Sequence, residues 1–554
     1  MQKRLHQKLR AYLQKFNYIG IVFAVIFYCF SMLPSLLPRP ALYQGIISGI
    51  SILIGYAIGV GISSLSRWLL QRELVTVNVK NIAWRVLIIS GLLLVFVFAL
   101  MGGRWQDQVH QLVGEQPNGD AHAVLILLLG MVTFIILLAA ARLLRQLTRI
   151  VNRQFAKVLP HRIAVSLGVL AIIMIFGWLT SGLFLKTFVA TANRIYSSKN
   201  NTTPDGVMPT NSQLRSGGPN SVVAWDTLGY QGQSFIGTGP TQQQIADYSN
   251  TAALEPIRVY AGINSAPTAQ ARANLALQEL KRTKAFERDI LILATATGTG
   301  WLEPQSVDSI EYMYGGNTAI VSQQYSYLPS WISFLVDKEN ATIAAKALYD
   351  AVFAEWSKLP VDERPKLIAY GLSLGSFGGQ SAYVGIGDLT ASIDGALFMG
   401  TPNDTRLWQN VTNGREPSSP EILPVYQNGV SVRFAANNSQ ITSNQSNWQY
   451  PRVLYMQHAS DPVVWFSFDL LLNEPDWLKE PRGPDVSPQT RWFPFVTFFQ
   501  VTVDQFFGTT VPNGHGHNYA NTIVNAWAAV TNPPNWSDDK RDRLQQIIDP
   551  YANE

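Results

Sequence analysis

The chain has 554 residues, of which 47% are hydrophobic and only 14% are charged, whereas soluble proteins carry about 25% charged residues. We therefore expect two or three domains with part of the chain in lipid. Residues 1–190 hold 18 Lys and Arg and 4 Asp and Glu, a net charge of +14. Residues 191–554 hold the other 24 Lys and Arg and the other 33 Asp and Glu, a net charge of −9. The mildly acidic second part argues against a nucleic-acid groove, and the single cysteine, Cys29, excludes an intramolecular disulfide and a Cys-rich metal site.

Five runs in the first 190 residues are long and apolar enough to cross roughly 30 Å of hydrocarbon as helices. They lie near residues 17–38, 42–65, 82–103, 121–141 and 163–185. The first run has no Ala-x-Ala cleavage site, so we expect a retained helix. The second run is rich in glycine, which is typical both of close helix packing and of membrane helices in general. Residues 1–190 are thus predicted to form an all-α transmembrane bundle, which makes the lipid bilayer a partner of this protein.

The distribution of Lys and Arg predicts the orientation of these helices. Basic residues are frequent before the first run and in the second and fourth connections, whereas the first and third connections hold one each, Arg39 and Arg104. We therefore expect a cytoplasmic N-terminus, five spans, and an exported remainder. In a bacterium that remainder faces the periplasm or the cell exterior.

Residues 191–220 are polar and rich in turn-forming residues, so they are predicted to be a linker. From residue 221 onward, short apolar runs alternate with helical patterns, which is typical of a mostly parallel sheet flanked by helices. The predicted strands are Ile257–Ala261, Ile290–Ala296, Lys366–Tyr370, Gly395–Met399 and Arg452–Gln457, and the predicted helices lie near 267–284, 340–358, 376–386 and 519–530. We therefore expect one α/β domain over residues 221–554, enlarged by insertions or a cap.

A Gly-x-Ser-x-Gly pattern, Gly371 to Gly375, follows one predicted strand and precedes a helical run. A tight strand–turn–helix is what a nucleophile elbow needs, because the turn exposes the serine hydroxyl at the edge of the sheet. Ser373 is therefore the predicted nucleophile. The alternative is an ordinary glycine-rich turn with a capping serine.

A serine hydroxyl needs a base, and in α/β-hydrolase folds the order along the chain is serine, acid, histidine. His515 and His517 lie in a turn-rich loop before the last helical run, and we favour His515 as the base without excluding His517. A metal site on this pair is the less favoured alternative, because no third ligand is evident at short spacing. His458 is expected to shape the loop that carries the acid.

The acid is predicted to be Asp461, which follows the strand 452–457 in His-Ala-Ser-Asp-Pro. Asp404, after the preceding strand, is the second choice, and a helix-capping role is the alternative for Asp461. The oxyanion of acyl transfer needs two backbone N–H donors. We expect one from Leu374 and the other from the segment Thr297, Gly298, Thr299 and Gly300, which is otherwise an ordinary glycine-rich turn.

These segments together resemble the bacterial α/β-hydrolase family whose members carry an N-terminal multi-helix membrane region. The resemblance covers nearly the whole chain and rests on Trp225-Asp-Thr-Leu-Gly-Tyr-Gln-Gly, Thr297-Gly-Thr-Gly-Trp301, Gln324-Tyr-Ser-Tyr-Leu-Pro-Ser-Trp331, Gly371-Leu-Ser-Leu-Gly-Ser376, Gln457-His-Ala-Ser-Asp-Pro462 and Gly514-His-Gly-His-Asn-Tyr519. It implies an α/β-hydrolase fold and a Ser–Asp–His hydrolase, and it implies no substrate. Leu372 stands where many relatives have Glu, a difference that bears on local electrostatics and not on the chemical class.

The leading functional hypothesis is a lipid or fatty-ester hydrolase without a cofactor. Three aromatic and apolar stretches are expected to form an acyl groove or a membrane-facing cap, or else to pack in the core: Tyr325–Phe334, Val463–Leu472 and Arg491–Phe499. An acyltransferase would use the same acyl-enzyme and pass the acyl group to an alcohol. A membrane scaffold with a degenerate hydrolase domain is the alternative from another class, and the complete set of candidate triad residues argues against it.

Overall fold

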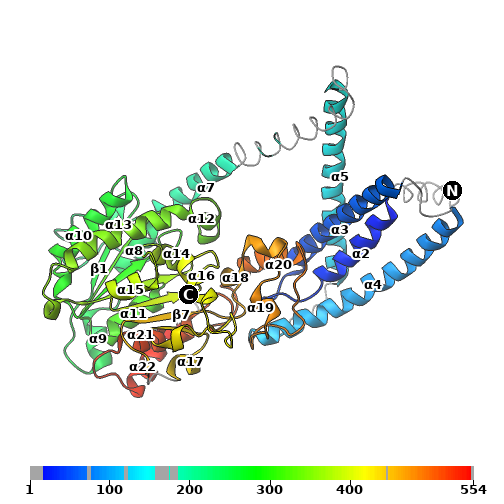
Figure 1. The fold of residues 1–554 in the computed structure, drawn as a ribbon. Coiled ribbons are helices and arrows are strands. Elements are labelled where there is room, and N and C mark those ends of the chain that lie inside the picture. The colour runs from blue at the N-terminus through cyan, green and yellow to red at the C-terminus, as the bar shows by residue number, and fades with distance from the viewer. Residues whose placement is uncertain are drawn as a thin grey trace. The chain divides into compact units, whose positions relative to one another are not determined.

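A computed structural model describes residues 16–70, 77–117, 123–155, 174, 177, 185–443 and 447–550 (Figure 1). The chain divides into two compact units. The helical unit comprises Met1–Leu185 together with Ser467–Phe507, and the sheet unit comprises Lys186–Phe466 and Gly508–Glu554. A segment from the second half of the chain thus belongs to the helical unit.

The helical unit contains α2 (Tyr18–Ser31), α3 (Ala41–Leu70), α4 (Val77–Leu112) and α5 (Ala123–Phe155). Within the described residues, three helices are long and apolar enough to cross a membrane: α3, the part of α4 from Asn81, and α5 to Ile150. The first predicted span ends early, because α2 stops at Ser31 ahead of Pro34 and Pro38, and proline cannot donate to a continuing helix. The fifth predicted span, 163–185, lies outside the described residues except for Met174, Gly177 and Leu185.

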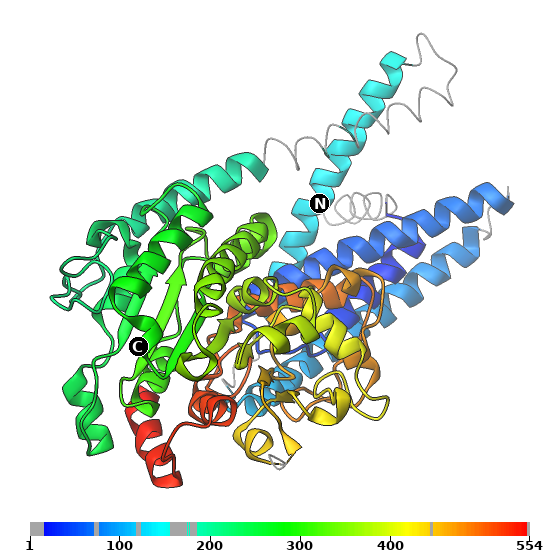
Figure 2. The same ribbon diagram turned by 60° about the vertical axis from the view of Figure 1, so that its left-hand side comes forward.

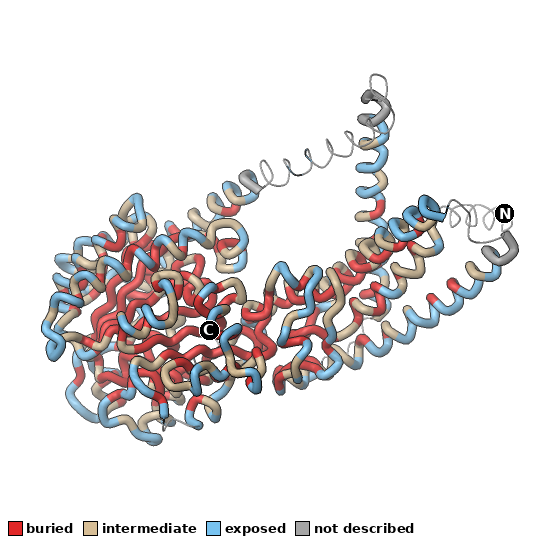
Figure 3. The backbone as a smooth tube through the Cα atoms, in the orientation of Figure 1, coloured by how far each residue is buried: buried red, intermediate tan, exposed pale blue. Residues whose placement is uncertain are grey.

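The surfaces of α4 and α5 are apolar and exposed. Ile89 and Leu92 are 71% and 67% exposed, and Val124 is 71% exposed, so that much of both helices is pale blue in Figure 3. Helix α3, in contrast, packs through its glycines: a Cβ on Gly59 would lie 2.5 Å from the Ile19 carbonyl oxygen of α2, and one on Gly49 would lie 2.5 Å from Thr133 Cβ of α5. These glycines therefore permit close helix contacts, and the exposed apolar side chains suit a lipid environment.

The segment Ser467–Phe507, here called the insertion, contains η7 (Phe468–Leu471), α19 (Asp476–Lys479), α20 (Val496–Asp504) and η8 (Gln505–Phe507). Its assignment to the helical unit differs from the predicted single domain over residues 221–554. The predicted linker also differs, because α7 (Leu185–Asn200) occupies its first residues. Ala192 of α7 packs with Leu328 and Ile332 of the sheet unit.

The sheet unit is built on seven parallel strands (Figure 2). They are β1 (Ile257–Ala261), β2 (Ile290–Thr295), β3 (Thr318–Gln323), β4 (Lys366–Leu372), β5 (Gly395–Met399), β6 (Val432–Ala435) and β7 (Arg452–Met456). The order across the sheet is β1-β3-β2-β4-β5-β7-β6. This confirms the predicted α/β fold, with β3 and β6 as strands that the apolar pattern did not predict.

Helices cover both faces of the sheet (Figure 1). One face carries α10 (Ala269–Arg282), α13 (Lys338–Trp356) and α14 (Leu374–Gln380), and the other carries α11 (Pro304–Met313) and α21 (Ile523–Thr531). The remaining helices are α8 (Gly229–Gly237), α9 (Gln242–Ser249), α12 (Ser330–Val336), α15 (Ile386–Ser392), α16 (Arg406–Asn413), α17 (Asn438–Thr442), α18 (Pro462–Trp465) and α22 (Asp538–Ile548). The three-layer arrangement buries both faces, so the strands read as continuous apolar runs.

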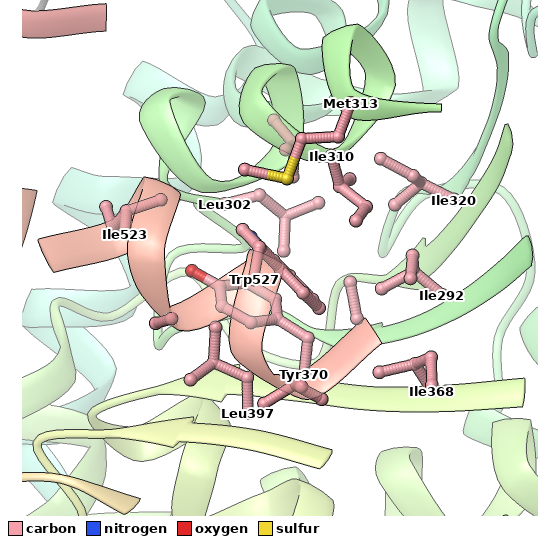
Figure 4. Close-up of a cluster of buried hydrophobic side chains, with 14 of the residues drawn as sticks. Ile292, Leu302, Ile310, Met313, Ile320, Ile368, Tyr370, Leu397, Ile523 and Trp527 are labelled. Atoms are coloured by element: carbon pink, nitrogen blue, oxygen red, sulfur yellow. The ribbon is translucent and has the colours of Figure 1, made fainter. Parts of the chain in front are cut away.

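The main core lies between the sheet and the layer of α11 and α21. Figure 4 shows Tyr370 of β4 beside Trp527 of α21, whose ring centroids are 5.4 Å apart, with Ile310 of α11 and Ile320 of β3 in the same cluster. All four side chains are at most 1% exposed. This core fixes the central strand β4, whose carboxyl end carries the predicted nucleophile.

A buried charge cluster lies beside this core. Arg258 of β1 donates to Glu311 through Nε at 2.8 Å and Nη2 at 2.7 Å, and it also pairs with Asp308. Arg258 is 1% exposed and Glu311 is fully buried. Burial raises the pKa of Asp308 to about 6, while the neighbouring Arg258 guanidinium acts in the opposite direction. The cluster joins β1 to α11.

Candidate active site

The predicted nucleophile occupies a strained turn at the carboxyl end of β4. Ser373 follows the last residue of β4 and precedes the first residue of α14, with φ 57° and ψ −127°. Its N–H donates to the Met399 carbonyl of β5 at 2.9 Å. A positive φ is unusual for serine, and this strain is what a nucleophile elbow requires.

The two glycines of the pattern are needed for close packing around this turn. A Cβ on Gly371 would lie 2.5 Å from the Gly375 carbonyl oxygen, and a Cβ on Gly375 would lie 2.2 Å from the Thr295 carbonyl oxygen at the end of β2. Both distances are shorter than real Cβ contacts. The glycines therefore let the elbow lie directly against the end of β2, from which the predicted oxyanion segment continues.

The structure brings the predicted acid to one of the two candidate bases. His517 Nδ1 lies 2.7 Å from Asp461 Oδ2. Asp461 is fully buried, and its carboxylate also accepts hydrogen bonds from the Tyr519 hydroxyl at 2.6 Å and from the Val463 N–H at 2.8 Å. Asp461 also caps α18, so the expected capping role and the pairing with histidine occur together.

The other ring nitrogen of His517 is available for chemistry. Nε2 is buried and makes no hydrogen bond to any described part of the chain. The ring lies against Gly400, the residue after β5, since a Cβ on Gly400 would be 2.3 Å from His517 Cε1. Strand β5 pairs with β4 in the register Leu372 to Met399, so this ring lies at the same sheet edge as Ser373. An imidazole fixed at Nδ1 by a carboxylate and open at Nε2 is suited to general-base chemistry.

The hydrogen bond to Asp461 comes from His517, and not from His515, which the sequence analysis favoured. His515 is half-buried in the preceding turn, where its N–H donates to the Pro512 carbonyl at 3.2 Å. Asp404, the second choice for the acid, instead forms an ion pair with Lys338 and is about a third exposed. Of the candidate acids and bases, Asp461 and His517 are therefore the two that lie within hydrogen-bond distance of each other.

The loops that carry the acid and the base are joined by further hydrogen bonds. His458 Nδ1 lies 2.9 Å from the Gly516 carbonyl oxygen, and the Gly516 N–H donates to Ser460 Oγ at 2.8 Å. The His458 ring also stacks on Tyr519, with centroids 4.3 Å apart. His458 therefore connects the two loops. Tyr519 was not among the predicted site residues, although it lies only two positions after His517.

Three of the four N–H groups in the predicted oxyanion segment already donate hydrogen bonds to other groups of the chain. Thr297 N–H donates to the Trp301 carbonyl at 2.9 Å, Gly300 N–H to the Thr297 carbonyl at 2.9 Å, and Gly298 N–H to Ser330 Oγ at 3.2 Å. Leu374, the other predicted donor, is the first residue of α14, where a backbone N–H has no intrahelical acceptor. Thr299 is therefore the member of the segment whose N–H best suits the role of second donor.

A carboxyl group that the sequence analysis did not single out lies in the field of His517. Glu303 is half-buried at the start of α11, directly before Pro304. Burial raises its pKa to about 7, while its backbone hydrogen bond with Gln305 and the nearby His517 act in the opposite direction. Only its position after the glycine-rich segment could have drawn attention to it. Among the described residues, no cluster of three or more His, Cys, Asp or Glu side chains is placed to hold a metal ion.

Comparison with protein families agrees with this architecture. The profile described as "Alpha/beta-hydrolase family" matches residues 257–544, and the profile described as "Alpha/beta-hydrolase family N-terminus" matches residues 32–240. No curated protein and no solved structure matches the chain. The first match spans β1 to α22 and includes Ser373, Asp461 and His517.

Proposed function

Because this chain belongs to the alpha/beta-hydrolase family, we propose that it is a membrane-anchored serine hydrolase that cleaves lipid or fatty esters. The observation that carries this proposal is the 2.7 Å contact between His517 Nδ1 and Asp461 Oδ2, which leaves Nε2 buried and without a hydrogen bond in the described chain. The strained Ser373 lies at the same edge of the sheet. The candidate nucleophile, acid and base follow one another along the chain in the order that this fold uses.

In the proposed reaction, Ser373 Oγ attacks the ester carbonyl carbon and its proton passes to His517 Nε2. Asp461 holds the imidazole by Nδ1 and stabilises the imidazolium that forms. The N–H groups of Leu374 and Thr299 donate to the oxyanion of the tetrahedral intermediate. His517 then returns the proton to the leaving alcohol, and a water molecule activated in the same way hydrolyses the acyl-enzyme.

The proposed substrate class follows from the helical unit. Three helices suit a membrane, so a bilayer-resident ester is always near this enzyme. Some side chains in the apolar stretches expected to form a groove or cap are buried, namely Leu328, Ile332 and Trp465. Others are exposed, since Phe468 and Leu472 are 62% and 66% exposed. The exposed side chains of the insertion support the cap interpretation, and the buried ones belong to the core.

The proposed orientation is a cytoplasmic N-terminus with the sheet unit on the far side of the membrane. Its basis is that segments rich in Lys and Arg alternate along the chain with connections that hold only one basic residue each. An alkaline phosphatase fusion after residue 200 is expected to be active, and a fusion of a cytoplasmic reporter at the same point is expected to be inactive. The reverse pair of results would overturn the orientation and leave the chemistry untouched.

The chemistry is tested with a fluorophosphonate probe, which labels an activated serine. Wild-type protein is expected to become labelled, and Ser373→Ala is expected to lose labelling and ester turnover by about 10⁴-fold or more. Labelling of Ser373→Ala at the wild-type rate would contradict the assignment of the nucleophile. Analysis of the products then separates hydrolysis from transfer, because only a transferase forms a new ester with an added alcohol.

The base and acid are tested with matched pairs of variants. His517→Ala is expected to be as inactive as Ser373→Ala, because the members of a triad act as a unit, whereas His515→Ala keeps most of the activity. Asp461→Asn is expected to lose about 10⁴-fold in turnover, and Asp404→Asn far less. An inactive His515→Ala beside an active His517→Ala would reverse the assignment.

A further inference from the structure

The insertion packs on one end of the membrane helices. Gln500 Nε2 of α20 donates to the Leu33 carbonyl at 2.9 Å and to the Ser31 carbonyl at 3.3 Å, which lie just beyond α2 and at its last residue. The Phe493 ring stacks on Phe30 with centroids 3.8 Å apart. These contacts place α20 against the end of α2 at which the chain turns toward α3.

A buried charge reinforces this packing. The Asp504 carboxylate of α20 accepts hydrogen bonds from the Ser35 hydroxyl and from the Leu36 N–H, and its Oδ1 lies 3.7 Å from Arg39 Nε. The side chains of Arg39 and Asp504 are both fully buried. An acid and a base buried together are costly to separate, so the insertion is held at a fixed place on the connection between α2 and α3.

Helix α4 reaches the same end of the unit. Its length corresponds to about 54 Å, which exceeds the roughly 30 Å of hydrocarbon. Near its C-terminus, Gln108 Oε1 accepts from Ser487 Oγ of the insertion at 3.3 Å, and Gln106 Oε1 accepts from the Arg39 N–H at 3.0 Å. Polar contacts therefore gather between the C-terminal part of α4, the connection between α2 and α3, and the insertion.

Exposed apolar side chains occur both on α3 and on the insertion, in the region where the two are in contact. Leu42, in the first turn of α3, is 50% exposed. The neighbouring Tyr43 contacts Phe506 and Phe507 of η8, with ring centroids 6.4 and 4.9 Å apart. Phe506 is itself 45% exposed. Aromatic side chains are typical of the boundary between acyl chains and headgroups.

We propose that the insertion Ser467–Phe507 lies in the headgroup layer of the bilayer, with Phe468, Leu472 and Phe506 in contact with lipid acyl chains. The proposal deepens the proposed function and rests on it, because an enzyme with a segment immersed in the membrane takes its ester from the bilayer and not from solution. The occupant of this surface is lipid. A protein that covers the same surface is one of the outcomes that the experiment separates.

The first experiment measures immersion without turnover. Cys29 is the only cysteine and is buried, so a Cys29→Ser background accepts a single environment-sensitive fluorophore at any chosen position. The variants Leu472→Cys and Phe506→Cys are labelled in the full-length protein in phosphatidylglycerol/phosphatidylethanolamine nanodiscs. Lys479→Cys is the matched control, because Lys479 lies on the same insertion, pairs with Asp476 and has a side chain 55% exposed.

We expect lipids with spin-labelled acyl chains to quench the fluorophores at 472 and 506 at least twofold more than the one at 479. Equal quenching at all three positions would overturn the proposal, as would quenching at none of them. The second result would mean that protein and not lipid covers this surface.

The second experiment connects immersion to the substrate. The double variant Leu472→Glu/Phe506→Glu is expected to lose at least about tenfold in kcat/KM on a long-chain ester in vesicles while changing less than about twofold on a soluble short-chain ester. An equal loss on both esters would contradict the proposal. If wild-type protein hydrolysed neither ester, the proposed function would fail and the quenching result would still decide the immersion.

Discussion

Gly400 is the residue whose replacement most directly tests the position of His517. It follows β5 with φ +54°, and a Cβ there would lie 2.3 Å from His517 Cε1, 2.7 Å from His517 Nδ1 and 3.1 Å from Tyr519 Cε2. Ordinary contacts of a Cβ begin at 3.4 Å. Gly400→Ala therefore forces the imidazole away from Gly400 by about 1 Å, or forces the backbone to move by a similar amount.

The expected loss follows from this displacement. Misplacing a reacting group by about 1 Å costs roughly 10²-fold in rate, equivalent to about 2.7 kcal/mol in the activation free energy. The positive φ adds about 1 kcal/mol to the cost of folding, because alanine tolerates this conformation less well than glycine. We therefore expect kcat/KM for a short-chain ester to fall by about 10²-fold, with a small decrease in melting temperature.

Gly315→Ala is the matched control. Gly315 has φ +58° in the turn between α11 and β3, and a Cβ there would have no heavy atom within 4 Å. The control thus carries the same conformational cost without touching His517. Ester turnover and thermal unfolding are measured for both variants. If Gly400→Ala kept kcat/KM within about threefold of the control while remaining folded, His517 would not be the base.

Three further changes probe other groups: Glu303 and Tyr519 lie near His517, and Arg258 joins β1 to α11. The pKa of Glu303 is raised from 4.5 to about 7, so the wild type loses stability as the pH rises from 4.5 to 7. Glu303→Gln is therefore expected to stabilise the protein on the order of 3 kcal/mol above pH 7 and to leave its stability unchanged below pH 4.5. Thermal unfolding of both proteins between pH 4 and 8 measures the difference. Tyr519→Phe removes a hydrogen-bond donor to the Asp461 carboxylate, so kcat is expected to fall about tenfold with little change in KM. An unchanged kcat would mean that the Tyr519 hydroxyl does not position this carboxylate. Arg258→Met removes the cation that pairs with the buried carboxyl groups of Asp308 and Glu311. The free energy of unfolding, measured with denaturant, is expected to fall by about 3–5 kcal/mol. A decrease below about 1 kcal/mol would contradict the buried pairing.

The strands with a continuous apolar run could be predicted from the sequence, and the two others could not. The predicted ranges for β1 and β5 agree with the structure at both ends, and those for β2, β4 and β7 agree within two residues. In β3 the last two residues, Ser322 and Gln323, are polar but buried, so the apolar run is too short to stand out. β6 has only four residues and lies at the edge of the sheet.

The candidate nucleophile Ser373 and the candidate acid Asp461 could be predicted from local patterns, since each follows a strand and is marked by only a few neighbouring residues. The choice between His515 and His517 is different. Both follow a glycine with positive φ, Gly514 and Gly516, so the local sequence treats them alike. The direction of each side chain is set by hydrogen bonds from Gly516 to the acid loop, and these join residues more than fifty positions apart. No local pattern carries that information.

Local sequence patterns also could not predict that the insertion belongs to the helical unit. Its aromatic and apolar residues resemble a core segment of the sheet unit, and only long-range contacts such as Phe30 with Phe493 assign it to the helices. The buried partners of Asp504 lie more than 460 positions earlier in the chain. A pattern search along the sequence compares neighbours and does not detect such pairs.

The insertion interrupts the chain between the candidate acid and the candidate base. The insertion begins at Ser467, six positions after Asp461, and ends at Phe507, ten positions before His517. The acid and base loops are nevertheless joined directly to each other, through Gly516, Tyr519 and the histidine–aspartate contact, by hydrogen bonds that lie entirely within the sheet unit. The geometry of the pair is therefore set without the insertion. If the insertion contacts lipid as proposed, substitutions on it should lower turnover of esters in vesicles more than turnover of soluble esters, whereas substitutions at Gly400 or Tyr519 should lower the rate on every ester.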